Sequence, residues 1–401
     1  MANPGTVATE MKNPGPWIIP SGLKKVLIAF VILGGVTFLA GLKVDPVRTW
    51  ASFVHNHFYF LSLGLGGLFF ASIQWITGSM WSAPLRRLAE ALTSYLPVVF
   101  LTFGLLYFGI PHLYLWSHAS HVQGDLVLEG KSGYLNVSFF TLRNLLAIGL
   151  WCLFAMKMVG NSLAQDQSGE YKLTLKNRVL SPAFLALFAI TFTMASFDQL
   201  MSLDPHWFST MFGVYCFAGL FYSTLAAICL LSLYMISNGQ LKSFINVNHM
   251  HDLGQFMFGF TVFWAYIGFS QFMLIWYANL PEETGYFIHR LSGGWVQVSF
   301  FLLVGKFMVP FLSLLPRHAK RNFVTLRNVA IFMLVAQWID VMWMVQPEFF
   351  AQGPKFGWME IGLTLGFLGM FGLAIARFLS RHSTVAIGDP RLAEAVFHHH
   401  L

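Results

Sequence analysis

Ten apolar stretches constrain this chain of 401 residues more than any other feature of its sequence. About 20 helical residues are needed to cross the roughly 30 Å of hydrocarbon in a bilayer. The stretches are long and continuous, whereas strands of a membrane barrel alternate over about ten residues. The sequence therefore predicts an all-α polytopic membrane protein, with spans near 24–43, 55–79, 92–113, 137–159, 181–203, 207–237, 252–278, 293–316, 324–346 and 357–380.

The composition argues against other classes of protein. Hydrophobic residues make up 56% of the chain and charged residues only 10%, which is far from the balance of a soluble domain. The net charge of +7 is spread over short segments between the apolar runs, so no nucleic-acid partner is expected. The lipid bilayer is the expected surroundings.

Cysteine and histidine give no sign of a metal or haem site made by this chain alone. The three cysteines, Cys152, Cys216 and Cys229, lie in apolar stretches without metal-site spacing. The fourteen histidines, such as His55 and His57, are expected mostly at helix ends or in loops. A b-type haem needs two ligands that face each other inside the membrane, so none is expected.

The distribution of basic residues predicts the orientation. With the N-terminus in the cytoplasm, seventeen Lys and Arg fall in inside segments and six in outside segments or helix ends. This bias predicts that both termini, residues 1–23 and 381–401, are cytoplasmic. The apolar run after Lys24-Lys25 could also be a signal peptide ending near Ala40-Gly41, but we interpret it as the first span.

The stretch from Asp198 to Cys216 is the expected joint between two halves of the membrane domain (24–380). Asp204-Pro205 predicts a tight reversal, with the proline near the start of the next helix. Spans two to five (about 55–203) and six to nine (about 207–346) would form two four-helix bundles, with spans one and ten peripheral. Residues 114–136 predict a long outer loop, and residues 160–180 a polar inner loop.

Lys306 is the most informative single residue, because it lies near the middle of the eighth span. A lysine there costs at least about 2.5 kcal/mol unless it is paired, solvated or neutral. It either forms a structural ion pair with a carboxylate of another helix, takes part in a proton relay or ligand site, or extends its amine to the membrane surface. These interpretations remain open from sequence.

Further ionisable residues gather towards the two faces of the membrane. An outer collection is either a satisfied network or a polar site for a quinone headgroup or a proton exit; it comprises Arg143, Asp198, Asp204, His206, His289, Arg290, Asp340 and Glu360. An inner collection marks helix ends and, if protons move, their entrance; it comprises Glu90, His249, His251, Asp252 and Arg327. Asp252 alternatively caps the seventh span.

Three stretches carry a resemblance to a known family. They are SLDPHWFSTMFGVYCFAG (202–219), FTVFWAYIGFSQFMLIWYANLPEETGYF (260–287) and the run with Gly294-Trp295, Pro310-Phe311 and Pro316-Arg317. The chain resembles the polysulfide-reductase membrane-subunit family, also called NrfD-like, over about residues 20–385. Within that family it is most similar to the second large membrane subunit of bacterial alternative complex III.

The resemblance implies a place in a respiratory complex of the bacterial inner membrane. Such subunits carry two four-helix bundles and contain no redox centre of their own. The implied partners are a second NrfD-like subunit, an iron-sulfur subunit, c-type cytochrome subunits and a terminal oxidase, with haem and clusters held only by those partners. Menaquinone or another quinone would bind near the outer face, and the role suggested for this subunit is proton conduction coupled to quinol oxidation.

The residues and the resemblance together give two candidate sites. The candidate proton path comprises Lys306, Asp198, Asp340, Asp204, His206, His251 and Asp252. The candidate quinone site comprises Arg143, Arg290, Asp198 and His206. The alternatives are a stand-alone secondary transporter, which predicts broken helices at matching places in two halves, and a structural anchor whose buried charges are all paired and dry.

Overall fold

We analysed a computed structural model of the chain that describes residues 13–398. These residues contain ten helices long and apolar enough to cross a membrane and no strand, which confirms the predicted fold class. The predicted terminal segments fall partly outside the described residues, at 1–12 and 399–401. The spans are α2 (Ser21–Val44), α3 (Pro46–Thr77), α4 to α6 (Ala83–Leu113), α9 (Val137–Ser168), α10 with a 3-10 turn (Tyr171–Leu203), α11 (Phe212–Ser237), α12 (Val247–Ala278), α14 to α15 (Trp295–Leu314), α17 with a 3-10 turn (Phe323–Glu348) and α18 (Trp358–Leu379).

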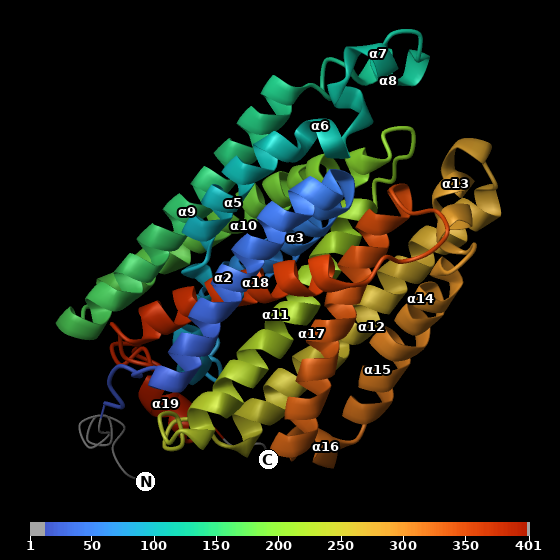
Figure 1. Cartoon of the computed structure of the whole chain (residues 1–401). Coiled ribbons are helices and arrows are strands. Elements are labelled where there is room, and N and C mark those ends of the chain that lie inside the picture. Colours follow the sequence, from blue (N-terminus) through green and yellow to red (C-terminus); the bar gives the residue numbers. More distant parts are fainter. Residues whose placement is uncertain (1–12, 399–401) are drawn as a thin grey trace.

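Short helices mark the two ends of the molecule (Figure 1). One end carries α7 (Ala119–Val122), α8 (Leu126–Lys131) and α13 (Pro281–Arg290), and we call it the α13 end. The other carries α16 (Arg317–Arg321) and α19 (Leu392–Val396), and we call it the α19 end. The even number of spans returns the chain to the end from which it started.

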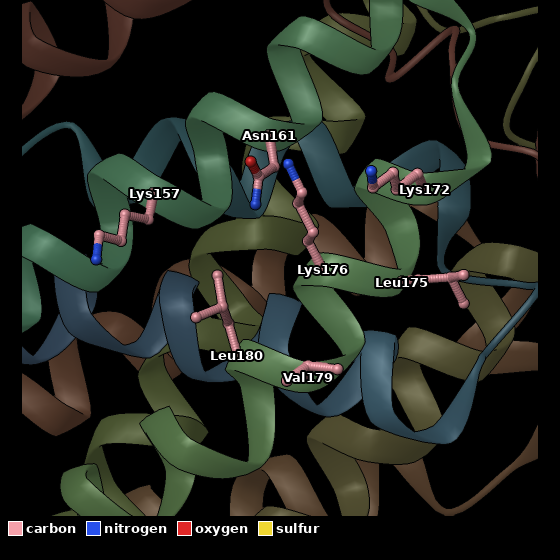
Figure 2. A pocket seen from close by; sticks show the side chains of 7 residues that line it. All are labelled: Lys157, Asn161, Lys172, Leu175, Lys176, Val179 and Leu180. Atoms are coloured by element: carbon pink, nitrogen blue, oxygen red, sulfur yellow. The ribbon is translucent and has the colours of Figure 1, made fainter.

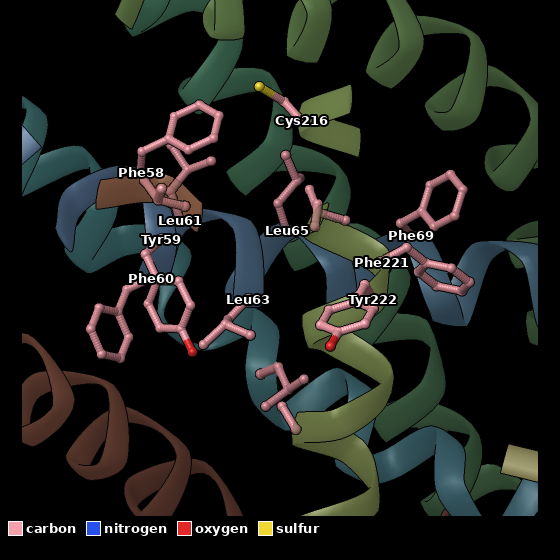
Figure 3. Close-up of a cluster of buried hydrophobic side chains, with 14 of the residues drawn as sticks. Phe58, Tyr59, Phe60, Leu61, Leu63, Leu65, Phe69, Cys216, Phe221 and Tyr222 are labelled. Carbon is pink, nitrogen blue, oxygen red and sulfur yellow. The ribbon is translucent and has the colours of Figure 1, made fainter. Parts of the chain in front are cut away.

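Helix α3 lies at the centre of the molecule. In its most apolar window 83% of the residues are buried, against 17% for α2, so α3 is surrounded by protein and α2 is peripheral. Figure 3 shows Phe58, Tyr59 and Phe60 of α3 in one part of this core, and Phe69 of α3 beside Phe221 and Tyr222 of α11 in another. The rings of Phe69 and Phe221 meet edge to face with their centroids 5.0 Å apart, a favourable arrangement for aromatic pairs.

The remaining spans pack in two groups around α3 and α11. Helix α3 contacts α4, α5 and α10, and α9 packs on α5 and α10. Helix α11 contacts α12 and α17, and the α14 to α15 span packs on both of these helices. The last span of each group contacts the first span of the other: α10 lies against α11, and α17 lies against α3. The division into two repeated bundles is still an interpretation of the sequence.

Glycines allow α2 and α18 to approach closely. A Cβ on Gly366 would lie 2.7 Å from the Cα of Gly34, and one on Gly369 would lie 2.6 Å from the carbonyl oxygen of Leu27. Small residues spaced three or four apart are a common device for packing helices in lipid. The bidentate ion pair of Arg48 with Glu360, at 2.8 Å for both bonds, then ties α18 to α3.

Replacing Gly366 by leucine should force α2 and α18 apart, because the new side chain meets the backbone of Gly34. We expect a loss of about 1–3 kcal/mol of stability, the usual cost of overpacking. The midpoint of thermal unfolding in detergent measures it. Gly35→Leu is the matched control, since a Cβ on Gly35 has nothing within 4 Å. Equal midpoints for the two variants would contradict this account of the contact.

Two expectations about connecting segments were wrong. Residues 160–180 form no loop: α9 continues to Ser168 and α10 begins at Tyr171, with Gly169 in the left-handed conformation between them. Polar residues there extend the two helices because their side chains bond to each other, as Asn161 does to Asn177 at 2.8 Å. Pro205 does not start the next helix either, since α11 begins at Phe212 and residues 204–211 form a loop.

The third span begins earlier than expected and is interrupted. Helix α4 (Ala83–Thr93) is followed by α5 (Leu96–Leu106), and Pro97 occupies the first turn of α5, where proline is tolerated. The predicted outer segment 114–136 does form a long connection, although it contains α7 and α8.

The C-terminal segment packs across the α19 end. Asp389 forms an ion pair with Arg86 of α4, and the amide of Gly388 donates to Asp166 at the end of α9. The imidazole Nε2 of His398 lies 2.7 Å from Asp252 of α12. Residues after the last span thereby connect the two groups of helices at this end.

Candidate functional site

Lys306 lies in an irregular turn of its helix. Residues Leu302–Met308 form a π-helical segment between α14 (Trp295–Phe301) and α15 (Val309–Leu314). Such segments are rare and occur often at functional sites, because the extra residue per turn redirects a side chain. Lys306 is eleven residues from the start of α14, which places it about 17 Å along the span. Its side chain is completely buried.

The carboxylate of Asp340 is the partner of Lys306. The ammonium Nζ lies 2.5 Å from Asp340 Oδ2 and 2.6 Å from Gln337 Oε1, both on α17. The hydroxyl of Tyr215 on α11 donates to Asp340 Oδ1 at 2.5 Å. We call Lys306 and Asp340 the core pair. Three helices therefore contribute to one hydrogen-bonded chain, Lys306 to Asp340 to Tyr215, within the hydrophobic interior.

Aromatic rings and a glycine shape the space around the core pair. The ammonium lies 4.0 Å from the ring centre of Trp264 on α12 and 5.2 Å from that of Tyr222 on α11. Both contacts stabilise a cation in a low-dielectric site. Gly219 leaves room for Gln337, since a Cβ there would lie 2.5 Å from the amide nitrogen. The buried indole N–H of Trp264 has no hydrogen-bond partner among residues 13–398.

A second buried pair, Arg143 on α9 and Asp198 on α10, lies nearer the α13 end. We call it the outer pair. The guanidinium Nη2 lies 2.8 Å from Asp198 Oδ1 and Nε lies 3.1 Å from Oδ2, so the contact is bidentate. Arg143 also donates to the backbone oxygen of Tyr134 at 2.9 Å and stacks on its ring at 3.7 Å. Burial, and then the charge of Asp198, raises the pKa of Tyr134 to about 12.

The outer pair borders a small cavity between α9 and α10. Its volume is about 180 Å³, and Ala147, Leu150 and Met194 form part of its apolar wall. Asn144 donates to Asp198 Oδ2 at 3.1 Å and accepts from Gln199 at 2.8 Å. The arrangement can hold a small polar group beside the guanidinium, with an apolar group against the wall.

The two pairs share one design. In each, a basic residue from the third span of a group meets an aspartate from the fourth span: α9 and α10 for the outer pair, the α14 to α15 span and α17 for the core pair. Each aspartate also accepts a bond from a neutral side chain, which is Asn144 for Asp198 and Tyr215 for Asp340. Such bonds are needed because a buried carboxylate must satisfy all its lone pairs.

Arg290 belongs to neither pair. It lies on α13, is fully buried, and forms an ion pair with Glu348 at 3.0 Å. It also donates to the carbonyl oxygens of Trp343 at 3.1 Å and Met344 at 3.0 Å, so it closes the end of α17, and to that of Tyr286 at 3.1 Å. No hydrogen bond or ion pair in the described part of the chain joins Arg290 to Arg143 or Asp198.

His206 lies at the surface of the α13 end. Its Nε2 lies 2.6 Å from Asp125 Oδ2, and its backbone amide donates to Asp204 at 3.3 Å. The hydrogen bond with His206 holds the pKa of Asp125 below its usual range. Lys131 donates to the carbonyl of Pro205 at 2.6 Å. The loop 204–211 therefore binds the outer segment 114–136.

Replacing His206 by alanine should loosen the outer segment, because Asp125 loses its side-chain contact with the loop 204–211. We expect several-fold faster hydrogen exchange of backbone amides in α7 and α8 at neutral pH. In the wild type the carboxylate contact is fully present above the unfolded pKa of Asp125, about 4, and is lost as the pH falls through the lower folded pKa. His289→Ala, at another exposed histidine of the α13 end, is the control. Unchanged exchange in the His206 variant would contradict the contact's role.

The inner collection lies at the α19 end, and Asp252 is not the cap of α12. Helix α12 begins at Val247, and the side chain of Asn246 before it accepts from the amide of Asn248 at 2.8 Å, so the N-cap is Asn246 and not Asp252. Asp252 instead contacts His398, and His251 Nδ1 lies 3.6 Å from Asp252 Oδ1. Glu90 is fully buried and pairs with Arg87 at 2.8 Å.

The structure thus groups the predicted residues into separate places. Lys306 and Asp340 meet, and so do Arg143 and Asp198, whereas Arg290 pairs with Glu348 and Asp204 and His206 lie on the surface loop. His251 and Asp252 lie near the opposite end of the molecule. His55 and His57 are not at a helix end: they are buried nine and eleven residues into α3, because that helix begins at Pro46.

Sequence reasoning missed the neutral side chains of both sites. Tyr215 and Gln337 complete the core pair, and Asn144 and Gln199 complete the outer pair. A usable signal existed for three of them. Asn144 and Gln199 directly follow the charged residues, and Gln337 precedes Asp340 by three positions, which places both on one helix face.

Comparison with known proteins found no protein-family model that matches this chain and no matching curated protein.

Proposed function

We propose that this chain is a membrane subunit of a bacterial respiratory complex that oxidises a quinol, and that it carries protons coupled to that reaction. The observation that carries the proposal is the core pair: a lysine and an aspartate 2.5 Å apart, joined to Tyr215, in the middle of an apolar helix assembly. Ionisable groups at such depth are costly, and in membrane proteins they commonly mark proton or ion pathways. The role in respiration rests on the sequence resemblance.

The chemistry of the core pair suits a proton relay. Ammonium with carboxylate and amine with carboxylic acid have the same net charge and differ by one proton moved along a single hydrogen bond. The hydroxyl of Tyr215 can donate to the carboxylate and accept a proton in turn. A proton added to the pair leaves a net positive charge, which the rings of Trp264 and Tyr222 stabilise.

Orientation follows from the basic residues of the sequence. We propose that both termini face the cytoplasm, so that the α19 end is the side of proton entry and the α13 end the side of release. His251 and Asp252 are the proposed entrance, and Asp198, Asp204 and His206 the proposed exit. The partners that would receive the electrons, an iron-sulfur subunit and c-type cytochromes, would lie at the α13 end, and the second NrfD-like subunit would lie beside this chain in the membrane.

The cavity beside the outer pair fits a quinone headgroup. Arg143 has five N–H donors, of which three are used by Asp198 and Tyr134, so two remain for a quinone carbonyl. The cavity volume of about 180 Å³ is below that of most sites for whole ligands, which suits a ring whose tail stays in the lipid. When bound, a quinone would supply the two-electron, two-proton chemistry. Arg143 would orient it, and Asp198 would hold the guanidinium in place.

A structural anchor is the second candidate function, and one observation favours it. Lys306, Arg143, Arg290 and Arg48 each pair with a carboxylate from another helix, as a scaffold requires. A transporter is less favoured, because the interruptions differ between the groups: the break in one is in its second span, after Thr93, and the π-helical segment of the other is in its third span.

Purification in mild detergent through an affinity tag on this chain tests the assignment to a respiratory complex. Mass spectrometry and a haem spectrum of the eluate identify the companions. We expect c-type haem and iron-sulfur subunits to accompany the chain. A single chain that elutes without haem would contradict the proposal and make solute transport the function to test.

A further inference from the structure

A basic pocket lies between α9 and α10 towards the α19 end of the molecule, away from both pairs. Figure 2 shows Lys157 and Asn161 on α9, facing α10 with its two lysines, and the side chain of Lys176 extending towards Asn161. The volume of the pocket is about 470 Å³. We call it the lysine pocket, and the residues that line it are Lys157, Asn161, Lys172, Leu175, Lys176, Val179 and Leu180.

The charge of the lysine pocket is not balanced by its walls. Three of the seven lining residues are lysines and none is acidic. Within residues 13–398, no ion pair or hydrogen bond is made by the amines of Lys157, Lys172 or Lys176, unlike those of Lys306 and Lys131. Asn161 is held in place by its bond to Asn177, which also fixes the distance between the two helices. The pocket therefore presents three unpartnered cations on a fixed frame.

The depth of the pocket places it at a membrane boundary. Asn161 is 18 residues beyond Arg143 on the continuous helix α9, which corresponds to about 27 Å. Because Arg143 lies in the second turn of α9 at the α13 end, Asn161 lies near the opposite edge of a hydrocarbon layer of about 30 Å. Phospholipid headgroups occupy that level.

The walls are apolar on the side that faces away from the helix assembly. Leu175 and Val179 are exposed on α10, and Met156 is exposed on α9 one residue before Lys157. Exposed aliphatic side chains continue along the same two helices at Leu146, Leu153 and Ile190. An occupant of the pocket would meet cations at one end and an apolar surface along the helices, which is the polarity of a phospholipid.

We infer that the lysine pocket binds the phosphate head of an anionic phospholipid, with its acyl chains along α9 and α10. Basic pockets between membrane helices are suited to phosphate heads, because each lysine near the surface adds attraction to an anionic lipid. An acidic protein segment or a free phosphate ion would use the three amines but would leave the apolar wall uncovered. The inference does not depend on the proposed respiratory role.

Native mass spectrometry of the full chain, with any subunits that accompany it, tests the inference. The protein is delipidated in mild detergent and titrated with diphosphatidylglycerol or with zwitterionic phosphatidylcholine. We expect bound diphosphatidylglycerol and no comparable phosphatidylcholine. The variant Lys157→Gln, Lys172→Gln, Lys176→Gln should bind the anionic lipid at least about tenfold more weakly. The variant with arginine at all three positions should retain binding, which shows that the pocket tolerates substitution.

A control with the same loss of charge separates the pocket from general attraction. Lys24→Gln, Lys25→Gln, Lys242→Gln removes three exposed lysines predicted to face the same side, and should leave binding unchanged. Equal weakening in both triple variants would overturn the inference. Displacement of the lipid by inorganic phosphate at equal phosphorus concentration would also overturn it. A cross-link from Lys172 or Lys176 to an acidic segment of a co-purified subunit would do the same.

Discussion

Replacing Lys306 by methionine should lower the free energy of unfolding by about 3–5 kcal/mol, because it leaves the carboxylate of Asp340 buried without its cation. Gln337 loses a bond as well, while Tyr215 still donates to Asp340. The midpoint of chemical unfolding in detergent measures the loss. We expect it to be among the largest effects of any single substitution in the chain.

The double variant Lys306→Met, Asp340→Asn should recover most of that stability. It removes both charges together, and an uncharged pair of similar volume is often as stable as the buried ion pair it replaces. The Asn side chain keeps an acceptor for Tyr215. A single variant within about 1 kcal/mol of the wild type would contradict the ion pair. The double variant therefore provides a folded protein that lacks both charges of the core pair. The single variant does not, because its loss of stability would obscure any effect on function.

Replacing Arg143 by methionine should be similarly costly, at about 3–5 kcal/mol, since Asp198 is nearly fully buried and would keep only neutral side-chain donors such as Asn144. The same unfolding measurement applies. Arg143→Lys should fall between the variant and the wild type, because lysine keeps the charge but not the two parallel bonds.

A paired substitution again separates charge from packing. Arg143→Met, Asp198→Asn should recover most of the stability lost by Arg143→Met alone, whereas adding Asp340→Asn to Arg143→Met should recover none, because Asp340 belongs to the other pair. Recovery by both second substitutions, or by neither, would show that the outer pair does not act as a unit. The pattern depends only on the contacts and not on the proposed function.

The ten spans were predictable because hydropathy reports the cost of placing a segment in lipid. Hydropathy did not predict which helices lie at the centre of the molecule and which lie at its periphery. Helix α2 is the most apolar span and also the least buried, while α3 is less apolar and the most buried. Lipid is as apolar as a protein core, so hydrophobicity does not distinguish the lipid-facing helix from the central one.

The charged residues of the site were predictable, but their pairing was not. Lys306, Asp340, Arg143 and Asp198 stand out because each interrupts an apolar run. Sequence gives their depth along a helix but not the direction of a side chain, and the π-helical segment at Lys306 changes that direction. The outer residues therefore looked like one collection, whereas Arg143, Arg290 and His206 have different partners.

The error at residues 160–180 has a related cause. The polar residues of this segment predict a loop, but Gln165 and Thr174 bond to each other between two helices that continue beyond the apolar runs. Helical hydrogen bonding does not require apolar side chains. Only the left-handed Gly169 marks the turn, and it was a usable signal in the sequence.

The proton-to-electron ratio of the purified complex in proteoliposomes tests the central claim most directly. The variant Lys306→Met, Asp340→Asn is compared with the variant Arg48→Met, Glu360→Gln, which removes the ion pair between α3 and α18 and leaves the core pair intact. If the core pair carries protons, the first variant continues to transfer electrons with a lower ratio, and the second keeps the ratio of the wild type. An unchanged ratio in the first variant would contradict the claim and leave the core pair as a structural contact.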